Sequence, residues 1–538
     1  MKTIYTNGKI YTLNDKRDIF NTIVVEDGKI VDLYNVEEKL EGENILDLEG
    51  KVVYPGFNDS HMHLGYYGYY ASQVDLAGTK SKKEALERIS KYIEENEIKE
   101  GQWVLGWGWN HDYFEDDKSF LNRFDLDQVT TDMPIAVSRA CGHVLSVNSK
   151  ALEIASIGNN PVQIEGGQID IDEDNNPIGV FRENASIEVR KHIPRRTLDQ
   201  VKESILGAIQ EMNSWGLTSI HSDDLSSVAG YDYKEILELF RKMAENGELN
   251  IRIYEQCRLK AEELDEFFEA GNTTGVGNDF FKIGSLKLFL DGSLGARTAA
   301  LREPYSDAPE EYGIITASEE EIDEMVGKAF EHNMQVAAHG IGDRAIETAI
   351  KCMSKNRRDD LRNGVIHCQI TDSDMLKSFK ENEILVYVQP IFLDYDRNIV
   401  WDRVGDRTYT SYNWKTLVDL GVHVSFGTDS PVEYFNPFHN IYEAVTRKDL
   451  NGLPEEGFLI AQALSVDESL RSYTYESAYA SFEEDVKGTL EVGKFADFIV
   501  LNEDLYKIDP MKIKDLTVEK TFVNGKEVYS KNKKNIEY

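Results

Sequence analysis

Two histidines separated by one residue, His61 and His63, are the first side chains in the sequence whose spacing suits chemistry. They follow the apolar run Val52–Tyr54 and a Pro-Gly turn, so we expect them on a β-strand. Side chains alternate between the two faces of a strand, which places Asp59 and both imidazoles on one face. Neutral histidine nitrogens are common zinc ligands. The pair therefore indicates a metal site, although this spacing taken alone also occurs by chance.

Three more polar side chains end apolar runs in the way expected of strand ends. His339 ends the run Val336–Ala338, His367 ends Val365–Ile366, and Asp429 lies beside a turn. For each alone, a hydrogen-bonded core histidine or a helix-capping aspartate is a sufficient explanation. In barrel enzymes, however, catalytic residues lie at the carboxyl ends of several strands. Together with the histidine pair, these residues favour one shared metal site.

Lys287 lies within the apolar run Ile283–Leu290. A lysine directed into a protein interior is costly unless it is paired or chemically changed. One interpretation is a buried ion pair with Asp291 or Asp59. The other is a carbamylated lysine, whose carboxylate would bridge two metal ions. The residues alone leave both open.

The elements that must position these residues read as strands alternating with helical patterns, which predicts a parallel sheet with crossover helices. The candidate strands begin near Phe57, Leu217, Asn250, Ile283, Gln335, Gly364, Leu385 and Val422. Eight such strands predict an α/β fold, a (β/α)8 TIM-type barrel. A ninth candidate strand, near Ile135, falls within residues 65–195, a stretch too long for a usual loop. We assign that stretch as a subdomain inserted after strand one.

Both ends of the chain carry hairpin signals. Asn7-Gly8 and Asp27-Gly28 lie between short strand-like runs, and Asn524-Gly525 repeats the pattern near the C-terminus. Either set alone is too small to bury a sheet face. We therefore predict a discontinuous β-sandwich domain built from residues 1–54 and 486–538, with the barrel domain at 55–485.

The composition excludes several classes of partner. Lys+Arg 59 against Asp+Glu 96 gives a formal net charge of -37, which should repel nucleic acid and anionic membranes. No apolar stretch approaches the ~20 residues of a membrane span, and the polar N-terminus lacks a signal-peptide core. The four cysteines have no CxxC spacing, which argues against a thiolate zinc site. We expect a soluble, cytoplasmic protein.

Eight stretches carry a resemblance to a known family. They are PGFNDSHMHL, GWGWNHDYF, ACGHVLSVNSKAL, LKLFLDGSLGARTAAL, AAHGIGDRAIE, GVIHCQI, FGTDSPVE and KGTLEVGKFADFIVLN. In this order they resemble the amidohydrolase superfamily of metal-dependent hydrolases over nearly the whole chain. More narrowly, the sequence is similar to the branch that contains N-substituted formamide deformylase and YtcJ-like proteins.

The resemblance implies a site with two zinc ions. The implied residues are His61 and His63 on the more buried ion, Lys287 as a bridging carbamate derived from CO2, His339 and His367 on the outer ion, and Asp429 as the last ligand and proton shuttle. The implied reaction is hydrolysis of a C–N bond in an N-substituted formamide or a related N-acyl or cyclic amide. Two alternatives stay open, namely a mononuclear deaminase without a lysine bridge and a non-catalytic regulatory protein on the same fold.

We expect the insertion to recognise the substrate, a small-molecule amide. Trp109, Asn110 and Asp112 combine aromatic surface with polar groups, as binding pockets do, although an aromatic subdomain core explains Trp109 equally well. His143 lies in a family-like stretch and is the candidate for a catalytic role, orienting the substrate or stabilising an oxyanion. The remaining candidates for substrate binding are Glu183 and Arg297, and groups that could support the ligands are His221 and Asp223. A homodimer stays open as a further partner.

Overall fold

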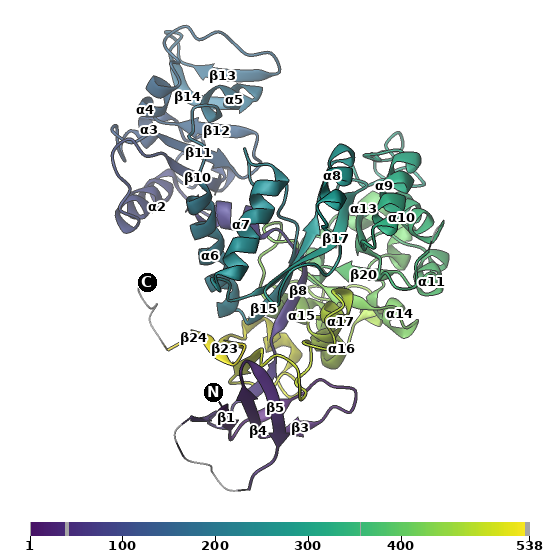
Figure 1. Ribbon diagram of the computed structural model, residues 1–538. Helices are drawn as coiled ribbons and strands as arrows, with labels where there is room; N and C mark the ends of the chain where they lie inside the picture. Colours follow the sequence, from purple (N-terminus) through teal and green to yellow (C-terminus); the bar gives the residue numbers. More distant parts are fainter. Residues whose placement is uncertain (1, 38–41, 43, 356, 533–538) are drawn as a thin grey trace. The chain divides into compact units, whose positions relative to one another are not determined.

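Eight parallel strands form the central sheet of the computed structural model, which describes residues 2–37, 42, 44–355 and 357–532. The strand order is β21-β20-β19-β18-β17-β16-β15-β8, and β8, β15, β17 and β20 of this sheet are labelled in Figure 1. The bounds are β8 (Phe57–Met62), β15 (Leu217–Ser222), β16 (Arg252–Cys257), β17 (Phe281–Phe289), β18 (Val336–Gly340), β19 (Gly364–His367), β20 (Leu385–Val388) and β21 (Val424–Phe426). All eight begin within three residues of the predicted positions.

The two outer strands of this sheet, β8 and β21, meet at the metal-ligand candidates. The backbone N–H groups of Thr428 and Asp429, just beyond β21, donate to the carbonyl oxygen of His61 at 3.3 and 2.8 Å. The sheet thus becomes a nearly closed barrel of the TIM type, and the predicted fold class is confirmed. Most residues of its strands are buried, as expected for a parallel sheet covered on both faces.

Helices follow most of the barrel strands. The longer ones are α6 (Leu198–Ser214), α7 (Tyr233–Glu245), α9 (Glu319–Glu331), α10 (Asp343–Lys355), α11 (Ser373–Glu381) and α15 (Pro437–Thr446). The shorter ones are α8 (Leu264–Glu269), α12 (Leu393–Asp396), α13 (Val400–Val404), α14 (Trp414–Asp419), α16 (Val466–Ser472) and α17 (Tyr475–Ala480). In α7, Asp232 and Glu235 form a capping box, and the face of Ile236, Phe240 and Met243 is buried.

The two ends of the chain form two further sheets. One has the order β5-β4-β1-β6 and the other β24-β23-β22-β7-β2-β3. The N-terminal strands are β1 (Lys2–Thr6), β2 (Lys9–Tyr11), β3 (Ile19–Phe20), β4 (Thr22–Glu26), β5 (Lys29–Tyr34), β6 (Ile45–Asp47) and β7 (Val52–Pro55). The C-terminal strands are β22 (Phe498–Leu501), β23 (Val518–Val523) and β24 (Lys526–Ser530). Because β7 pairs with β22, both ends share one core, as predicted.

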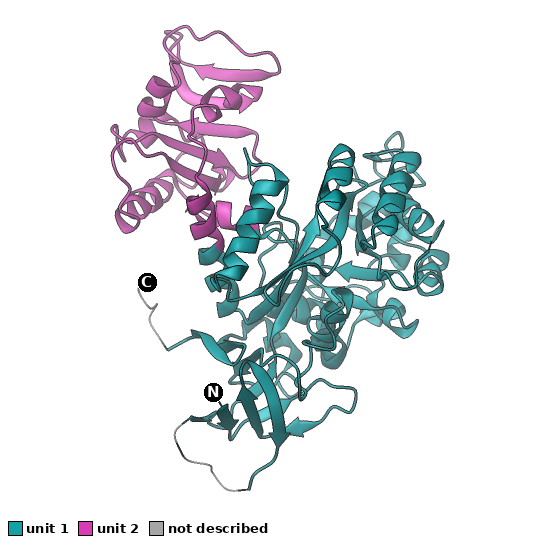
Figure 2. Ribbon diagram, viewed as in Figure 1, with its two compact units in different colours: residues 1–64, 206–538 teal, residues 65–205 magenta. Residues whose placement is uncertain are grey.

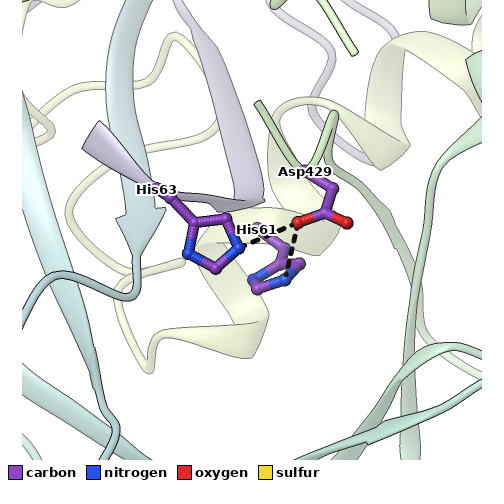
Figure 3. A group of neighbouring side chains, drawn as sticks. All are labelled: His61, His63 and Asp429. Atoms are coloured by element: carbon purple, nitrogen blue, oxygen red, sulfur yellow. Dashed lines mark hydrogen bonds and ion pairs between the residues drawn. The ribbon is translucent and has the colours of Figure 1, made fainter. Parts of the chain in front are cut away.

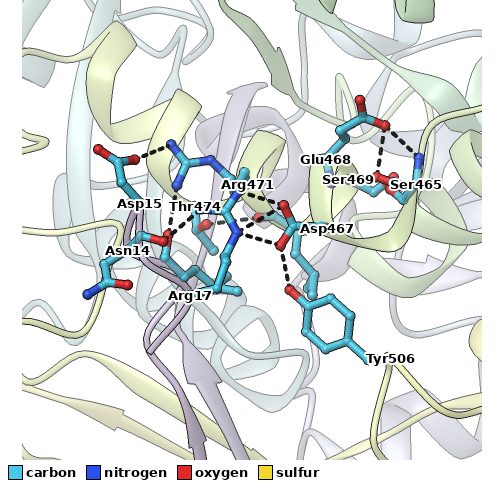
Figure 4. Close-up of polar contacts among 12 residues, drawn as sticks. Asn14, Asp15, Arg17, Ser465, Asp467, Glu468, Ser469, Arg471, Thr474 and Tyr506 are labelled. Carbon is cyan, nitrogen blue, oxygen red and sulfur yellow. Dashed lines mark hydrogen bonds and ion pairs between the residues drawn. The ribbon is translucent and has the colours of Figure 1, made fainter. Parts of the chain in front are cut away.

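Ion pairs and hydrogen bonds connect these terminal segments to the barrel. Arg17 pairs with Asp467 of α16 at 2.6 Å, and the hydroxyl of Tyr506 donates to the same carboxylate at 2.8 Å (Figure 4). Arg252, the first residue of β16, pairs with Asp497 at 2.7 Å, with both side chains buried. Residue 1 and residues 533–538, the ends of the predicted sandwich domain, lie outside the described residues.

Residues 65–205 form a second compact unit, separate from the unit of residues 1–64 and 206–538 (Figure 2). Its sheet has the order β13-β14-β12-β11-β10-β9. The strands are β9 (Val74–Asp75), β10 (Val104–Trp109), β11 (Ile135–Arg139), β12 (Val144–Val147), β13 (Gly167–Ile171) and β14 (Pro177–Glu183), and the helices are α1 (Leu64–Ala71), α2 (Lys82–Glu95), α3 (Arg123–Leu126), α4 (Ser149–Ile154) and α5 (Ile187–Arg190). Ile135 and Val137 of β11 belong to one apolar cluster and Ala136 to another, so each sheet face has its own core.

Across the described ranges, no helix is long and apolar enough to cross a membrane.

Candidate metal centre

His61, His63 and Asp429 form a compact cluster at the carboxyl end of the barrel strands. The Nε2 atoms of His61 and His63 lie 3.3 and 3.0 Å from Oδ1 of Asp429 (Figure 3). One potential ligand atom from each of the three residues lies within 4.8 Å of the others. The histidines come from strand one, β8, and its end, whereas Asp429 follows strand eight, β21. The barrel closure therefore assembles the group from residues far apart in sequence.

The second ring nitrogen of each histidine has its own partner, which fixes the ring orientation. Nδ1 of His61 lies 2.6 Å from Oε1 of Gln256, and Nδ1 of His63 lies 3.3 Å from the carbonyl oxygen of Asp223. Without a metal, Nε2–H of each ring can donate to Asp429, whereas with a metal each Nδ1 can carry the proton and leave Nε2 as the ligand atom. The donor set of two imidazoles and one carboxylate fits a zinc ion.

Burial and charge set the protonation of this cluster. Burial, with the nearby Lys287, lowers the pKa of His61 to about 3, so its ring is neutral at pH 7. Burial would also lower the pKa of His63, but the hydrogen bond and charge of Asp429 outweigh it and raise that pKa. Burial would raise the pKa of Asp429, but the hydrogen bonds from His61 and His63 hold it well below its usual range. The carboxylate is thus ionised and ready to bind a cation.

Lys287 reaches the same cluster from strand four, β17. Its Nζ lies 3.2 Å from Nε2 of His61, and the side chain is buried. Burial lowers the pKa of Lys287 to about 8, although the charges of Asp223 and Asp429 act in the opposite direction. Neither ion pair considered from the sequence is among the described contacts. Asp291 instead lies 3.2 Å from Nε2 of His339, and Asp59 accepts from Thr428 at 2.6 Å.

His339 and His367, at the ends of β18 and β19, lie beside the first cluster. Their ring centroids are 4.4 Å apart, and the ring of His367 lies 5.6 Å from that of His61. Nδ1 of His367 lies 2.8 Å from Oε1 of Gln389, and burial lowers the pKa of His367 well below its usual range. The structure therefore brings all six predicted metal-ligand residues to one end of the barrel.

The predicted substrate-binding residues lie in two places. Trp109 is fully buried in an apolar cluster of the second unit, and its Nε1–H donates to the carbonyl oxygen of Val137 at 3.2 Å. Trp109 is therefore a core residue of the second unit, which is the alternative to substrate binding that the sequence left open. Arg297 belongs to the barrel unit, where its guanidinium pairs with Asp307 at 2.8 Å. Among the described residues, no hydrogen bond or ion pair joins it to the histidines.

The other candidates form polar pairs within the second unit. Nδ1 of His143 lies 2.9 Å from Oε2 of Glu183. The guanidinium of Arg139 donates to both Asn110 and Asp112 at 2.8 Å. Their proposed contacts with substrate stay predictions.

Sequence reasoning missed two glutamines that hold the histidines. Gln256 is on β16, strand three, and its amide also donates to the carbonyl oxygen of Ser60 at 3.1 Å. Gln389 follows β20, strand seven, directly. Both are buried. Gln389 ends the apolar run Leu385–Val388, the signal that revealed His339 and His367, whereas Gln256 follows the charged residue Glu255. Applied to amides as well as to histidines, that signal would have found Gln389 but not Gln256.

Comparisons with known proteins agree with this geometry. Residues 44–529 match the Amidohydrolase family. Over 542 residues the chain is 34% identical to YtcJ of Bacillus subtilis, covering 99% of this chain and 100% of that protein. It is 23% identical to N-substituted formamide deformylase of Arthrobacter pascens, covering 96% of each. An uncharacterized metal-dependent hydrolase from Pyrococcus furiosus has a similar structure, with a TM-score of 0.75, 30% identity, and coverage of 94% of this chain and 100% of that one.

Proposed function

The chain belongs to the amidohydrolase family, and from that premise we propose that it hydrolyses a C–N bond in a small-molecule amide. The substrates proposed are N-substituted formamides and related N-acyl or cyclic amides, because one relative is named N-substituted formamide deformylase. The observation that carries the proposal is the group His61, His63 and Asp429, two oriented imidazoles and an ionised carboxylate at the catalytic end of the barrel.

We propose zinc as the metal, in two ions. The proposed ligands are His61 and His63 for one ion, His339 and His367 for the other, Lys287 between them, and Asp429 as the last ligand. When bound, the metal ions would supply an activated water and polarise the substrate carbonyl.

Asp429 is the proposed proton shuttle. Its carboxylate accepts a proton from the attacking water as the new C–O bond forms at the carbonyl carbon. It then delivers this proton to the nitrogen as the C–N bond breaks, which releases a carboxylic acid and an amine. The low pKa that His61 and His63 impose on Asp429 keeps it in the basic form needed for the first transfer.

Lys287 is the proposed site of carbamylation. The free amine attacks the carbon of CO2, an N–C bond forms as one C=O π bond opens onto oxygen, one Nζ proton passes to solvent water, and the resulting carbamate carries a negative charge. The lowered pKa of Lys287 supports this step, because the reactive form is the neutral amine. Lys287→Ala that retained two metals and full activity would contradict the role of Lys287.

The test of the proposed function is a screen of the purified, zinc-loaded protein against N-formyl, N-acetyl and cyclic amides, with metal content measured on the same sample. Release of amine from at least one class, lost on chelation and restored by zinc, supports the proposal. Absence of near-stoichiometric metal would favour a non-catalytic regulatory protein. Release of ammonia from an amino-substituted heterocycle, with one metal bound, would favour the deaminase alternative.

A further inference from the structure

Arg258 is an exposed arginine at the carboxyl end of the barrel strands. It lies one residue past the end of β16, strand three. Among the residues that the structure describes, its guanidinium forms no ion pair or hydrogen bond, and its ring contact is with Phe289. By contrast, Arg297 and Arg403 of the same unit both pair with Asp307. The guanidinium of Arg258 is therefore free to bind an anion.

The alternation of side chains along two adjacent strands places Arg258 and Phe289 next to the metal centre. Side chains two residues apart lie on the same face of a strand. Arg258 comes two residues after Gln256, which holds the ring of His61. On the neighbouring strand β17, Phe289 comes two residues after Lys287. Arg258 and Phe289 therefore lie one step further towards the carboxyl end than these residues of the metal centre.

Measured distances agree with this placement. Cζ of Arg258 lies 5.7 Å from the centroid of the Phe289 ring. The Phe289 ring in turn lies 4.2 Å from the ring of His339, centroid to centroid. Burial is the main cause of the lowered pKa of Lys287, and the charge of Arg258 adds to it. Arg258 is thus connected to the metal centre through one ring and lies within electrostatic reach of it.

Phe289 is a second, independent observation that points to a ligand. It is 45% exposed, although β17 is otherwise mostly buried. Binding pockets are lined mainly by apolar and aromatic side chains, with a few polar groups that fix the orientation of the ligand. An exposed ring beside an unpaired guanidinium fits that description. The pair suits a ligand in which an anionic group is joined to an apolar chain.

The neighbouring carboxylates do not neutralise Arg258 by direct pairing. Asp223 is buried, and its Oδ2 lies 3.9 Å from Nδ1 of His63. Burial raises the pKa of Asp223, and the charge of His63, with a smaller contribution from Arg258, acts in the opposite direction. Glu255 is also buried and accepts a hydrogen bond from the backbone N–H of Asp224 at 2.9 Å. Neither carboxylate forms an ion pair with Arg258 in the described structure.

We propose that Arg258 is a specificity-determining residue that binds a carboxylate on the substrate, beyond the amide that is cleaved at the metal centre. This inference rests on the proposed amide hydrolysis and narrows its substrates to amides that carry a carboxylate. The planar guanidinium donates two parallel N–H bonds to the two carboxylate oxygens. Phe289 contacts the apolar chain between the carboxylate and the amide. Because the net charge of -37 otherwise repels anions, holding one requires a dedicated cation.

The test uses the zinc-loaded full chain and measures formate release. The substrates are the N-formyl derivatives of glycine, 4-aminobutyric acid and 6-aminohexanoic acid, each compared with its uncharged methyl ester. We expect kcat/KM to be about 10- to 100-fold higher for the acid than for the ester at the best chain length, the range for a hydrogen bond between charged groups. A kcat/KM for the ester that equals or exceeds that of the acid at every length would overturn the proposal.

Variants of Arg258 assign the preference to this side chain. Arg258→Gln should remove most of it with the metal content unchanged, and Arg258→Lys, which keeps the charge but not the planar fork, should restore part of it. Arg357→Gln is the matched control, because it removes the same charge from the loop before β19, at the amino end of the barrel, and should leave the preference intact. A preference that persists in Arg258→Gln would assign the carboxylate to another group, such as the metal, and overturn the proposal.

A binding measurement separates this inference from the proposed function. Isothermal titration with hexanoate, and with 1-hexanol as the neutral probe, needs no turnover. We expect binding of hexanoate alone, weakened about 10-fold or more in Arg258→Gln. In Phe289→Leu, which removes the cation–π contact, it should weaken about 2- to 5-fold. If the protein hydrolyses no amide but binds hexanoate in this way, the proposed function fails and the role of Arg258 stands. If it hydrolyses amides but binds hexanoate equally well in the native chain and Arg258→Gln, the role of Arg258 is wrong and the function stands.

Discussion

Two histidine–carboxylate pairs of nearly the same length lie in different units of the chain. Nε2 of His63 is 3.0 Å from Asp429, and Nδ1 of His143 is 2.9 Å from Glu183. The side chains of the first pair are 17% and 11% exposed, whereas those of the second are 66% and 57% exposed. Water screens the second pair, and such exposed pairs typically contribute about 0–1 kcal/mol. Distance alone therefore does not identify a site, whereas distance together with burial does.

The first pair also belongs to a larger arrangement. His61 shares the same carboxylate oxygen, and Gln256 holds the far side of the His61 ring at 2.6 Å. Because the rings are held from behind, the nitrogens that face Asp429 are preorganised for a cation. The contrast between the two pairs predicts a graded series of effects on metal binding and catalysis.

The largest effect should come from removing a ring of the buried pair. His61→Ala deletes one of three converging ligand atoms, so we expect loss of bound zinc and activity at background level. His143→Ala is the matched control, because it removes an imidazole from an exposed pair and should leave the metal content unchanged. Metal analysis after gel filtration measures both. Full zinc occupancy in His61→Ala would exclude His61 as a ligand.

Asp429→Asn should cause the next largest effect. The amide keeps an oxygen for the metal but cannot take up the proton, so kcat should fall by about 10²- to 10⁴-fold, the usual contribution of general acid–base catalysis. Zinc content, measured in parallel, should stay close to that of the native chain. Unchanged kcat would rule out the proton shuttle, and loss of zinc together with activity would assign Asp429 a purely ligating role.

The sequence was sufficient for the parts of this site that depend on local pattern. Apolar runs ending in His339, His367 and Asp429 indicated strand ends. Because the carboxyl ends of parallel strands lie at the same end of a barrel, these residues were expected to lie together. It was also sufficient for the fold class, because the alternation of strands and helices and the hairpin turns at both ends are local signals.

The side-chain contacts between different strands could not be predicted from local pattern in the same way. The contact of Gln256 with His61 depends on the register of β16 relative to β8, two strands that are separated by β15 in the barrel. Likewise, the sequence allows an ion pair of Lys287 with either Asp59 or Asp291. Only the folded barrel shows that Asp59 accepts a hydrogen bond from Thr428 and that Asp291 contacts His339. The burial of a side chain could not be predicted in this way either, because the sequence around Trp109 does not distinguish a core residue from a substrate-binding one.

Gln256→Leu should have an intermediate effect. The change keeps the size of the side chain approximately but removes the acceptor at 2.6 Å from Nδ1 of His61, so the ring loses its fixed orientation. Loss of such a supporting contact typically lowers metal affinity or activity about 10- to 100-fold. Competition with a fluorescent zinc chelator measures the affinity. If zinc affinity and kcat both match those of the native chain, the preorganisation described above is wrong for His61.

The smallest effect on stability should come from His143→Ala and Glu183→Gln, which nevertheless give the sharpest test of the contrast. A double-mutant cycle on the free energy of unfolding should give a coupling of about 0–1 kcal/mol that falls as salt is added, because water screens the pair. The same variants report on the predicted role of His143 in substrate binding. Unchanged stability with a reduced kcat/KM would support that role, since a merely structural pair would not change turnover. Unchanged stability with unchanged kcat/KM would make the pair an ordinary surface contact, and a coupling well above 1 kcal/mol would mean that burial is not what separates the two pairs.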